Sequence, residues 1–266
     1  MNSSPIGIFD SGVGGLSVLQ EIRKLLPNED VLYIADSAYA PYGNKPVELV
    51  LERCHNLTEY LISSGAKAVV VACNTATAAA IQSLRENFSV PVVAMEPGVK
   101  PAIAATNTKT VGVLATENTL LSQQFANLVH RYANDVKVLS QPCPGLVEQI
   151  EAGLFADTKT ADLIRQYTQP LLEGGADTIV LGCTHYPLIK PQIAQLAGPT
   201  VTLIDTGKAV AQQLQRQLDE LQLLSGSTTS GTEKFWTSGE AQQIGAVMSS
   251  ILSTTITTAS LPDGLL

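Results

Sequence analysis

The stretch GAKAVVVACNT at residues 65–75 returns later in the chain as GADTIVLGCTH at residues 175–185. Each copy holds a short apolar run, rich in valine and isoleucine, that leads to a cysteine. Such a run between turn residues is typical of a strand buried in a sheet. A second pair, GIFDS at residues 7–11 and GVLAT at residues 112–116, extends the repeat. The pattern predicts two similar α/β lobes, each with a cysteine at the carboxyl end of a strand.

Apolar runs alternate with longer amphipathic stretches along the rest of the chain. This βαβα alternation is typical of parallel sheets covered by helices on both faces. We expect the first lobe to hold residues 1–97 and 208–266, and the second to hold residues 98–207. The expected strands are 5–9, 31–35, 68–72, 90–95, 111–115, 136–139, 178–181, 201–204 and 235–237, and the expected helices are 16–26, 47–63, 77–87, 122–132, 146–152, 160–172, 208–223 and 240–252.

The composition bounds the class of protein. With 266 residues, of which 45% are hydrophobic and 15% charged, the chain can bury a core in one large domain or two small ones. Its 16 basic against 24 acidic residues give a net charge of −8, which argues against binding nucleic acid or an anionic membrane surface. There is no apolar run of about 20 residues and no signal-peptide pattern at the start. We therefore expect a cytoplasmic protein without a membrane span.

The four cysteines fall into two kinds. No CxxC spacing occurs, so no metal site is expected. Cys54 falls within an expected helix and Cys143 lies between prolines, and both are interpreted as ordinary buried thiols. Cys73 and Cys183 each lie between a strand and a helix, where the helix N-terminus favours the thiolate.

Two facing lobes would place Cys73 and Cys183 on opposite sides of one cleft. Two thiols on either side of a substrate carbon can remove a proton from one face and return a proton to the other. A single strand-end cysteine is more often a core residue. The repeated cysteine context instead favours general acid–base catalysis with inversion.

The two thiols are expected to have different acid–base partners. Asp10 ends the first strand and can lie beside Cys73 at the same edge of the sheet. The repeat has Ala115 at that place, so Cys183 needs other help. The candidates for that help are His185, Glu148 and Glu151.

The glycine-rich segment at residues 10–15 supports a different hypothesis. Gly12 and Gly14 fit the dinucleotide fingerprint GxGxxG, but Ser17 stands at the third glycine position. A nucleotide-binding enzyme, or a non-catalytic pair of binding lobes, is therefore the minority hypothesis, because it gives the paired cysteines no purpose. The free amides of this segment, just before a helix, would also suit a carboxylate.

Five motifs occur in one order over nearly the whole chain. They are FDSGVGG at 9–15, PYG at 41–43, ACNTAT at 72–77, EPG at 96–98 and GCTHYP at 182–187. This set resembles the aspartate/glutamate racemase family, and within it the glutamate racemases. The resemblance implies two flavodoxin-like lobes with the active site between them, and interconversion of L- and D-glutamate without a cofactor. It further implies a cytoplasmic homodimer that supplies D-glutamate for peptidoglycan. An aspartate racemase with the same thiols is the nearest alternative.

The resemblance also implies roles for individual residues. Cys73 and Cys183 match the catalytic thiols, and Asp10 matches the carboxylate that assists the first. His185 and a glutamate would assist the second; the family's glutamate is followed after one residue by glycine, so this role goes to Glu151. The positions that would bind the glutamate substrate are Asp10, Ser11, Tyr42, Gly43, Asn74, Thr75, Thr116, Thr184 and His185. No metal is implied.

Overall fold

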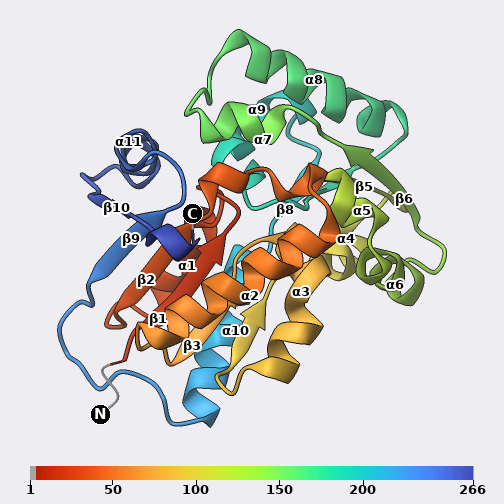
Figure 1. Ribbon diagram of the computed structural model, residues 1–266. Coiled ribbons are helices and arrows are strands. Elements are labelled where there is room, and N and C mark those ends of the chain that lie inside the picture. The colour runs from red at the N-terminus through yellow and green to blue at the C-terminus, as the bar shows by residue number, and fades with distance from the viewer. Residues whose placement is uncertain (1–3, 266) are drawn as a thin grey trace.

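The computed structural model describes residues 4–265 and shows two α/β lobes, each built on its own parallel sheet (Figure 1). Every neighbouring pair of strands in both sheets is parallel. In spatial order the first sheet contains β10 (Thr258–Ser260), β9 (Glu233–Thr237), β2 (Val31–Ala35), β1 (Ile6–Asp10), β3 (Ala68–Val71) and β4 (Val92–Ala94). The second contains β6 (Lys137–Pro142), β5 (Thr110–Ala115), β7 (Thr178–Leu181) and β8 (Thr202–Ile204).

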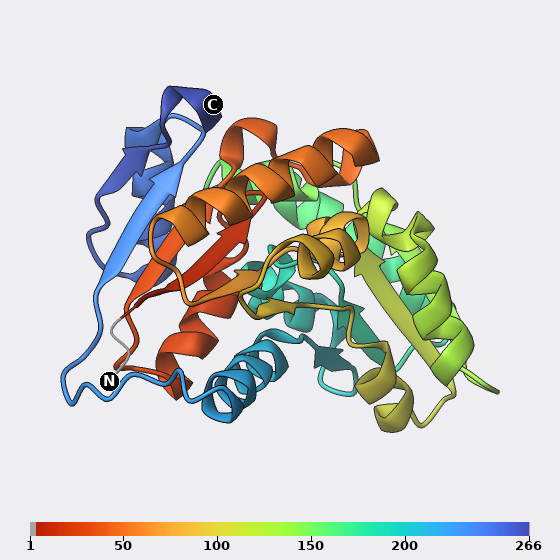
Figure 2. The same ribbon diagram turned by 60° about the horizontal axis from the view of Figure 1, so that its bottom comes forward.

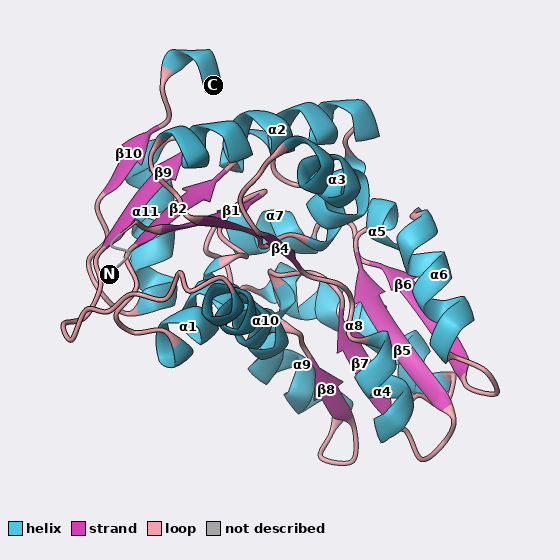
Figure 3. Ribbon diagram, turned by 90° about the horizontal axis from the view of Figure 1, so that it is seen from below, coloured by secondary structure: helices cyan, strands magenta, loops and turns pink. Residues whose placement is uncertain are grey.

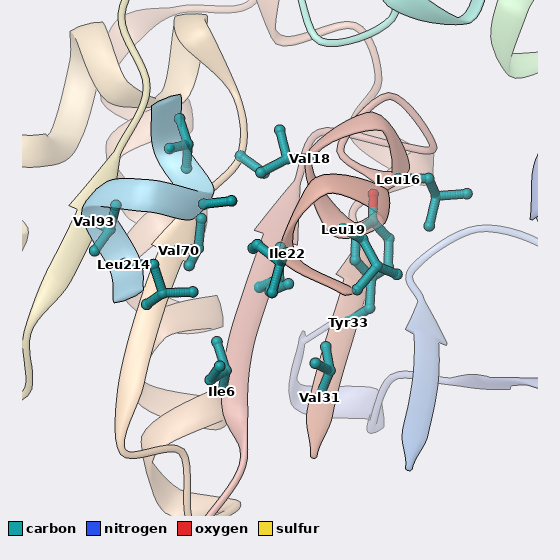
Figure 4. Packing of buried hydrophobic residues seen from close by; sticks show 14 of the residues in the cluster. Ile6, Leu16, Val18, Leu19, Ile22, Val31, Tyr33, Val70, Val93 and Leu214 are labelled. Carbon is teal, nitrogen blue, oxygen red and sulfur yellow. The ribbon is translucent and has the colours of Figure 1, made fainter. Parts of the chain in front are cut away.

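Helices cover both faces of the first sheet (Figure 3). The helices α1 (Leu16–Leu25), α10 (Gly207–Glu220) and α11 (Ala241–Leu252) pack on one face, and α2 (Val47–Ser63) and α3 (Asn74–Asn87) pack on the other. Figure 4 shows Leu19 and Ile22 of α1 beside Val31 and Tyr33 of β2 in the first of these cores. The apolar residues of α1 recur at helical spacing, which gathers them on the side of the helix that packs on the sheet.

The second lobe repeats this arrangement with fewer strands. One face of its sheet is covered by α7 (Leu146–Glu151), α8 (Thr158–Glu173) and α9 (Lys190–Ala197), and the other by α4 (Val99–Ala105) and α6 (Gln123–Tyr132). The short helix α5 (Glu117–Leu121) follows β5. The C-terminal strands β9 and β10, blue in Figure 2, extend the edge of the first sheet that lies away from the second lobe. Within residues 4–265, no helix has both the length and the hydrophobicity needed to cross a membrane.

The strand orders explain where a site can form. In the first sheet β1 lies between β2 and β3, and in the second β5 lies between β6 and β7. Each central strand therefore has connections that leave in opposite directions, which opens a crevice at the carboxyl ends of the strands. Cys73 follows β3 in the first crevice and Cys183 follows β7 in the second. The two repeated sequence motifs thus occupy equivalent places in the two lobes.

The elements differ from the sequence prediction in several places. The helix expected from Thr77 begins at Asn74, because the sulfur of Cys73 caps it by accepting a hydrogen bond from the Ala76 amide at 3.4 Å. Strand β6 continues to Pro142, since its outer residues still pair with β5. The elements α4, α5, α9 and β10 were not predicted, because each is too short for a period to be recognised in the sequence.

Candidate active site

The first thiol, Cys73, is buried at the N-terminus of α3. Its sulfur lies 3.8 Å from the hydroxyl of Ser11, which follows β1. Burial raises the pKa of the Cys73 thiol well above its ordinary value, and the nearby charge of Asp10 raises it further. The thiol is therefore neutral in the absence of a substrate, and it can act as a proton donor.

Asp10 is fully buried at the end of β1. One carboxylate oxygen accepts a hydrogen bond from the Gly15 amide at 2.8 Å, and the other accepts one from the Thr184 hydroxyl of the second lobe at 3.4 Å. Burial raises the pKa of Asp10 from 3.8 to about 6, although the positive charge of His185 opposes the rise. A carboxyl group with this pKa can take up and release a proton near neutral pH.

The second thiol, Cys183, is linked through a histidine to a glutamate. The sulfur lies 3.6 Å from Nδ1 of His185, and Nε2 of His185 lies 2.5 Å from Oε1 of Glu151. Burial alone would lower the pKa of His185, but its hydrogen bonds to Cys183 and Glu151 raise that pKa well above its ordinary value. The sequence left Glu148 and Glu151 open, and the structure brings Glu151 to His185. Glu148 lies instead beside Cys143, and both line a pocket together with Gly43 and Thr116.

The glycine-rich loop packs against this second group of residues. A Cβ atom on Gly12 would lie 2.0 Å from Oε1 of Glu151, and one on Gly14 would lie 2.4 Å from Nδ1 of His185. The Val13 amide donates a hydrogen bond to Oε1 of Glu151 at 2.6 Å. The two glycines are therefore explained by the close approach of the two lobes, and the loop needs no nucleotide to account for it.

Threonine hydroxyls meet where the lobes adjoin. The hydroxyl of Thr75, from the first lobe, lies 2.8 Å from that of Thr116 and 3.1 Å from that of Thr119, both from the second. The backbone of Gly43 approaches the same point. A Cβ atom added to Gly43 would lie 2.5 Å from the Cβ atom of Thr116. Thr119 was missed by the sequence reasoning, and only its spacing of three residues from Thr116 could have indicated it.

The remaining candidate residues differ in whether their hydrogen-bonding groups already have a partner in the protein. Within residues 4–265, neither polar atom of the buried Asn74 amide has a hydrogen-bond partner, so both can bind a ligand or water. The Tyr42 hydroxyl is already bound to Asp36 at 2.5 Å, so the side chain of Tyr42 is committed to a buried structural contact. Among the residues that sequence reasoning overlooked is Ser37, whose hydroxyl donates to Oε2 of Glu151 at 3.0 Å.

Two cavities reach this group of residues from different sides. One of about 190 Å³ is lined by Cys183 and by residues of α1, including Ser17. The other, of about 320 Å³, is lined by Gly43, Thr116 and Cys143. The two other thiols, Cys54 and Cys143, are free and buried. Burial raises the pKa of Cys143 to about 12, so it is a neutral thiol.

Comparison with known proteins places this site in a family. The family model for Asp/Glu/Hydantoin racemase matches residues 6–214. The glutamate racemase of Ectopseudomonas mendocina is 55% identical over 255 residues, which cover 95% of this chain and 97% of that protein.

Two crystal structures are similar over the whole chain. The glutamate racemase isoform RacE1 from Bacillus anthracis superposes with a TM-score of 0.90 at 34% identity, covering 99% of both chains. The glutamate racemase from Francisella tularensis in complex with D-glutamate superposes with a TM-score of 0.85 at 30% identity, covering 99% of this chain and 98% of that one. Together with the paired thiols and their carboxyl partners, these matches show that the chain belongs to the Asp/Glu racemase family, among its glutamate racemases.

Proposed function

We propose that this protein interconverts L- and D-glutamate without a cofactor, using Cys73 and Cys183 as the two acid–base groups. The observation that carries the proposal is that each buried thiol has its own ionisable partner, Asp10 near Cys73 and His185 with Glu151 beside Cys183. A single acid–base group would return the proton to the face it came from. Two separately supported thiols are suited to inversion.

The proton transfers balance in either direction. One thiolate removes the α-proton and becomes a thiol, while the electron pair of the C–H bond remains on the substrate carbon. The thiol on the opposite face then gives its proton to that carbon and becomes a thiolate. The enzyme thus ends each turnover with the charge on the other sulfur, and it must move a proton between its thiols and their partners before the next turnover.

The partners suit this exchange differently. His185, with its raised pKa, is an imidazolium that stabilises negative charge on the Cys183 sulfur. Asp10 has a pKa of about 6, so it can accept the proton of Cys73 when Cys73 must become the base. The α-proton of an amino acid is very weakly acidic, so the site must also stabilise the developing carbanion with preorganised donors.

The substrate would be bound by the buried polar groups at the lobe junction. Asn74 has an unsatisfied amide, and Thr75 and Thr116 hold hydroxyls at the same place. The rest of the proposed set is Asp10, Ser11, Thr184, His185 and the backbone of Tyr42 and Gly43. In addition we propose that residues 1–97 with 208–266 and residues 98–207 act as the two lobes that close on the substrate.

The family resemblance supplies the biological setting of the proposal. We propose a cytoplasmic homodimer that provides D-glutamate for peptidoglycan synthesis. The glutamate racemase of Francisella tularensis was crystallised with D-glutamate, which supports glutamate as the substrate here. Relative rates on glutamate and aspartate separate this proposal from the nearest alternative, an aspartate racemase.

The test uses purified reduced protein and L-glutamate in deuterated water, with no cofactor added. Optical rotation and deuterium at Cα are followed together. Loss of rotation with deuterium entering at Cα is the expected result. Unchanged rotation from folded, reduced protein would refute the proposal for glutamate, and a trial with D- and L-aspartate would then decide on the alternative.

A further inference from the structure

Glu151 is anchored by the opposite lobe, through a residue with no assigned role. Its Oε1 atom accepts from His185 and from the Val13 amide. Among the described residues, its Oε2 atom accepts a hydrogen bond from Ser37 alone, at 3.0 Å. Glu151 lies in the second lobe, and Ser37 and Val13 lie in the first. The carboxylate is therefore fully bonded only while the two lobes are together.

The backbone around Ser37 is tightly packed. Ser37 follows Asp36, which is fully buried and bound at two points by Arg53, with distances of 2.9 and 2.7 Å. A Cβ atom added to Gly239 would lie only 3.2 Å from the Cβ atom of Ser37, so the backbone of Gly239 packs closely against Ser37. Contacts within the first lobe thus position the backbone of Ser37, and its hydroxyl reaches Glu151 from there.

The contact also lies next to open space. A pocket of about 310 Å³ is lined by Ser37, Pro41, Glu148 and Glu151, and the Glu151 side chain is 12% exposed. Without the serine hydroxyl, Oε2 would face this pocket and the carboxylate could turn toward it. A carboxylate that turns away from His185 would no longer keep Nδ1 of that ring on the Cys183 sulfur.

We propose that Ser37 is a positioning residue for the Cys183 half of the reaction. It holds the Glu151 carboxylate toward His185, so that His185 stays aligned with Cys183. This inference rests on the proposed racemisation of glutamate, and it assigns Ser37 to one of the two proton transfers. Ser37 would have no direct effect on the transfer at Cys73.

This assignment gives a signature that a general loss of structure would not give. In Ser37→Ala, proton transfer at Cys183 becomes slower and transfer at Cys73 does not. The enantiomer deprotonated by Cys183 then shows a larger α-deuterium isotope effect on kcat/KM. The other enantiomer is deprotonated by Cys73 and only reprotonated by Cys183, so its α-deuterium effect falls toward one.

The experiment measures racemisation of L- and D-glutamate, each with and without deuterium at Cα. We expect kcat/KM of Ser37→Ala to fall roughly 10-fold, equally in both directions because the two enantiomers have the same free energy. The two isotope effects should move in opposite directions. The conservative variant Ser37→Thr keeps the hydroxyl and should restore both isotope effects toward the wild-type values.

A matched control loosens the lobes at the opposite side of the site. The Asn118 side chain donates to the backbone carbonyls of Tyr42 and Lys45, at 3.1 and 2.9 Å, and touches neither thiol group. In Asn118→Ala slower closure should move both isotope effects in the same direction. Isotope effects in Ser37→Ala that stay unchanged, or that move together as in this control, would overturn the role of Ser37. A wild-type enzyme inactive on both enantiomers would instead overturn the proposed function.

Discussion

Replacing Asp10 by asparagine should make the protein more stable at neutral pH while abolishing its activity. Asp10 is fully buried, and burial raises its pKa from 3.8 to about 6. Asparagine keeps an oxygen that can accept the Gly15 amide, and it removes the charge that burial disfavours. A stabilised but inactive variant is the expected outcome where a site holds a charge at the expense of stability.

The sign and size follow from the two pKa values. Between about pH 4 and pH 6 the folded state binds more protons at Asp10 than the unfolded state, so stability falls as pH rises through this range. Above about pH 6 the carboxylate is charged in both states, and the rise of its pKa from 3.8 to about 6 corresponds to about 3 kcal/mol of lost stability. Asp10→Asn should thus be about 3 kcal/mol more stable than the wild type at about pH 8, and should lose this advantage below about pH 4.

The assay is urea unfolding of both proteins at a series of pH values between these limits. Titrating groups far from Asp10 contribute equally in both proteins, and the attraction between Asp10 and His185 is already contained in the Asp10 pKa of about 6. A stability difference that does not change with pH would refute the reasoning. So would a variant that is less stable than the wild type at about pH 8, because the burial cost of the Asp10 carboxylate would then be absent.

Four further substitutions test other parts of the site. Cys73→Ala and Cys183→Ala should each abolish racemisation in a polarimetric assay, and near-wild-type turnover in either would defeat the two-thiol mechanism. Gly12→Ala should lower kcat/KM at least roughly 100-fold, because the new methyl group would overlap the Glu151 side chain. As a control, the methyl group of Gly264→Ala would have no atom within 4 Å, so this variant should keep the wild-type rate. Thr75→Val keeps the shape but loses the hydroxyl contacts to Thr116 and Thr119; KM for glutamate should rise several-fold, and an unchanged KM would place the substrate elsewhere.

Much of the architecture could be predicted because the repeated motif carries two kinds of information at once. The runs that end at Cys73 and Cys183 are buried strands, and their alternation with amphipathic segments indicates parallel sheets. The same runs lead directly to the two cysteines, and parallel strands bring their carboxyl ends to one edge of the sheet. Asp10 beside Cys73 followed from this reasoning, since β1 and β3 are neighbours.

The contacts between the lobes could not be predicted in this way. Ser37 and Glu151 are far apart in the sequence and lie in different lobes, and no periodicity links them. Gly12 and Gly14 suggested a weak nucleotide motif, because a sequence alone cannot tell whether a glycine makes room for a phosphate or for a side chain of another lobe. Tyr42 shows the converse, since a residue matched to substrate binding has a hydroxyl committed to Asp36.

These inter-lobe contacts bear on how the two halves of the proposed reaction would be kept in step. Asp10, in the first lobe, accepts a hydrogen bond from Thr184 of the second. Glu151, in the second lobe, accepts bonds from Val13 and Ser37 of the first. Each carboxylate is therefore completed by the lobe that does not carry it. Opening the lobes would weaken both acid–base groups together, so neither thiol would be fully supported while the substrate site is open to water.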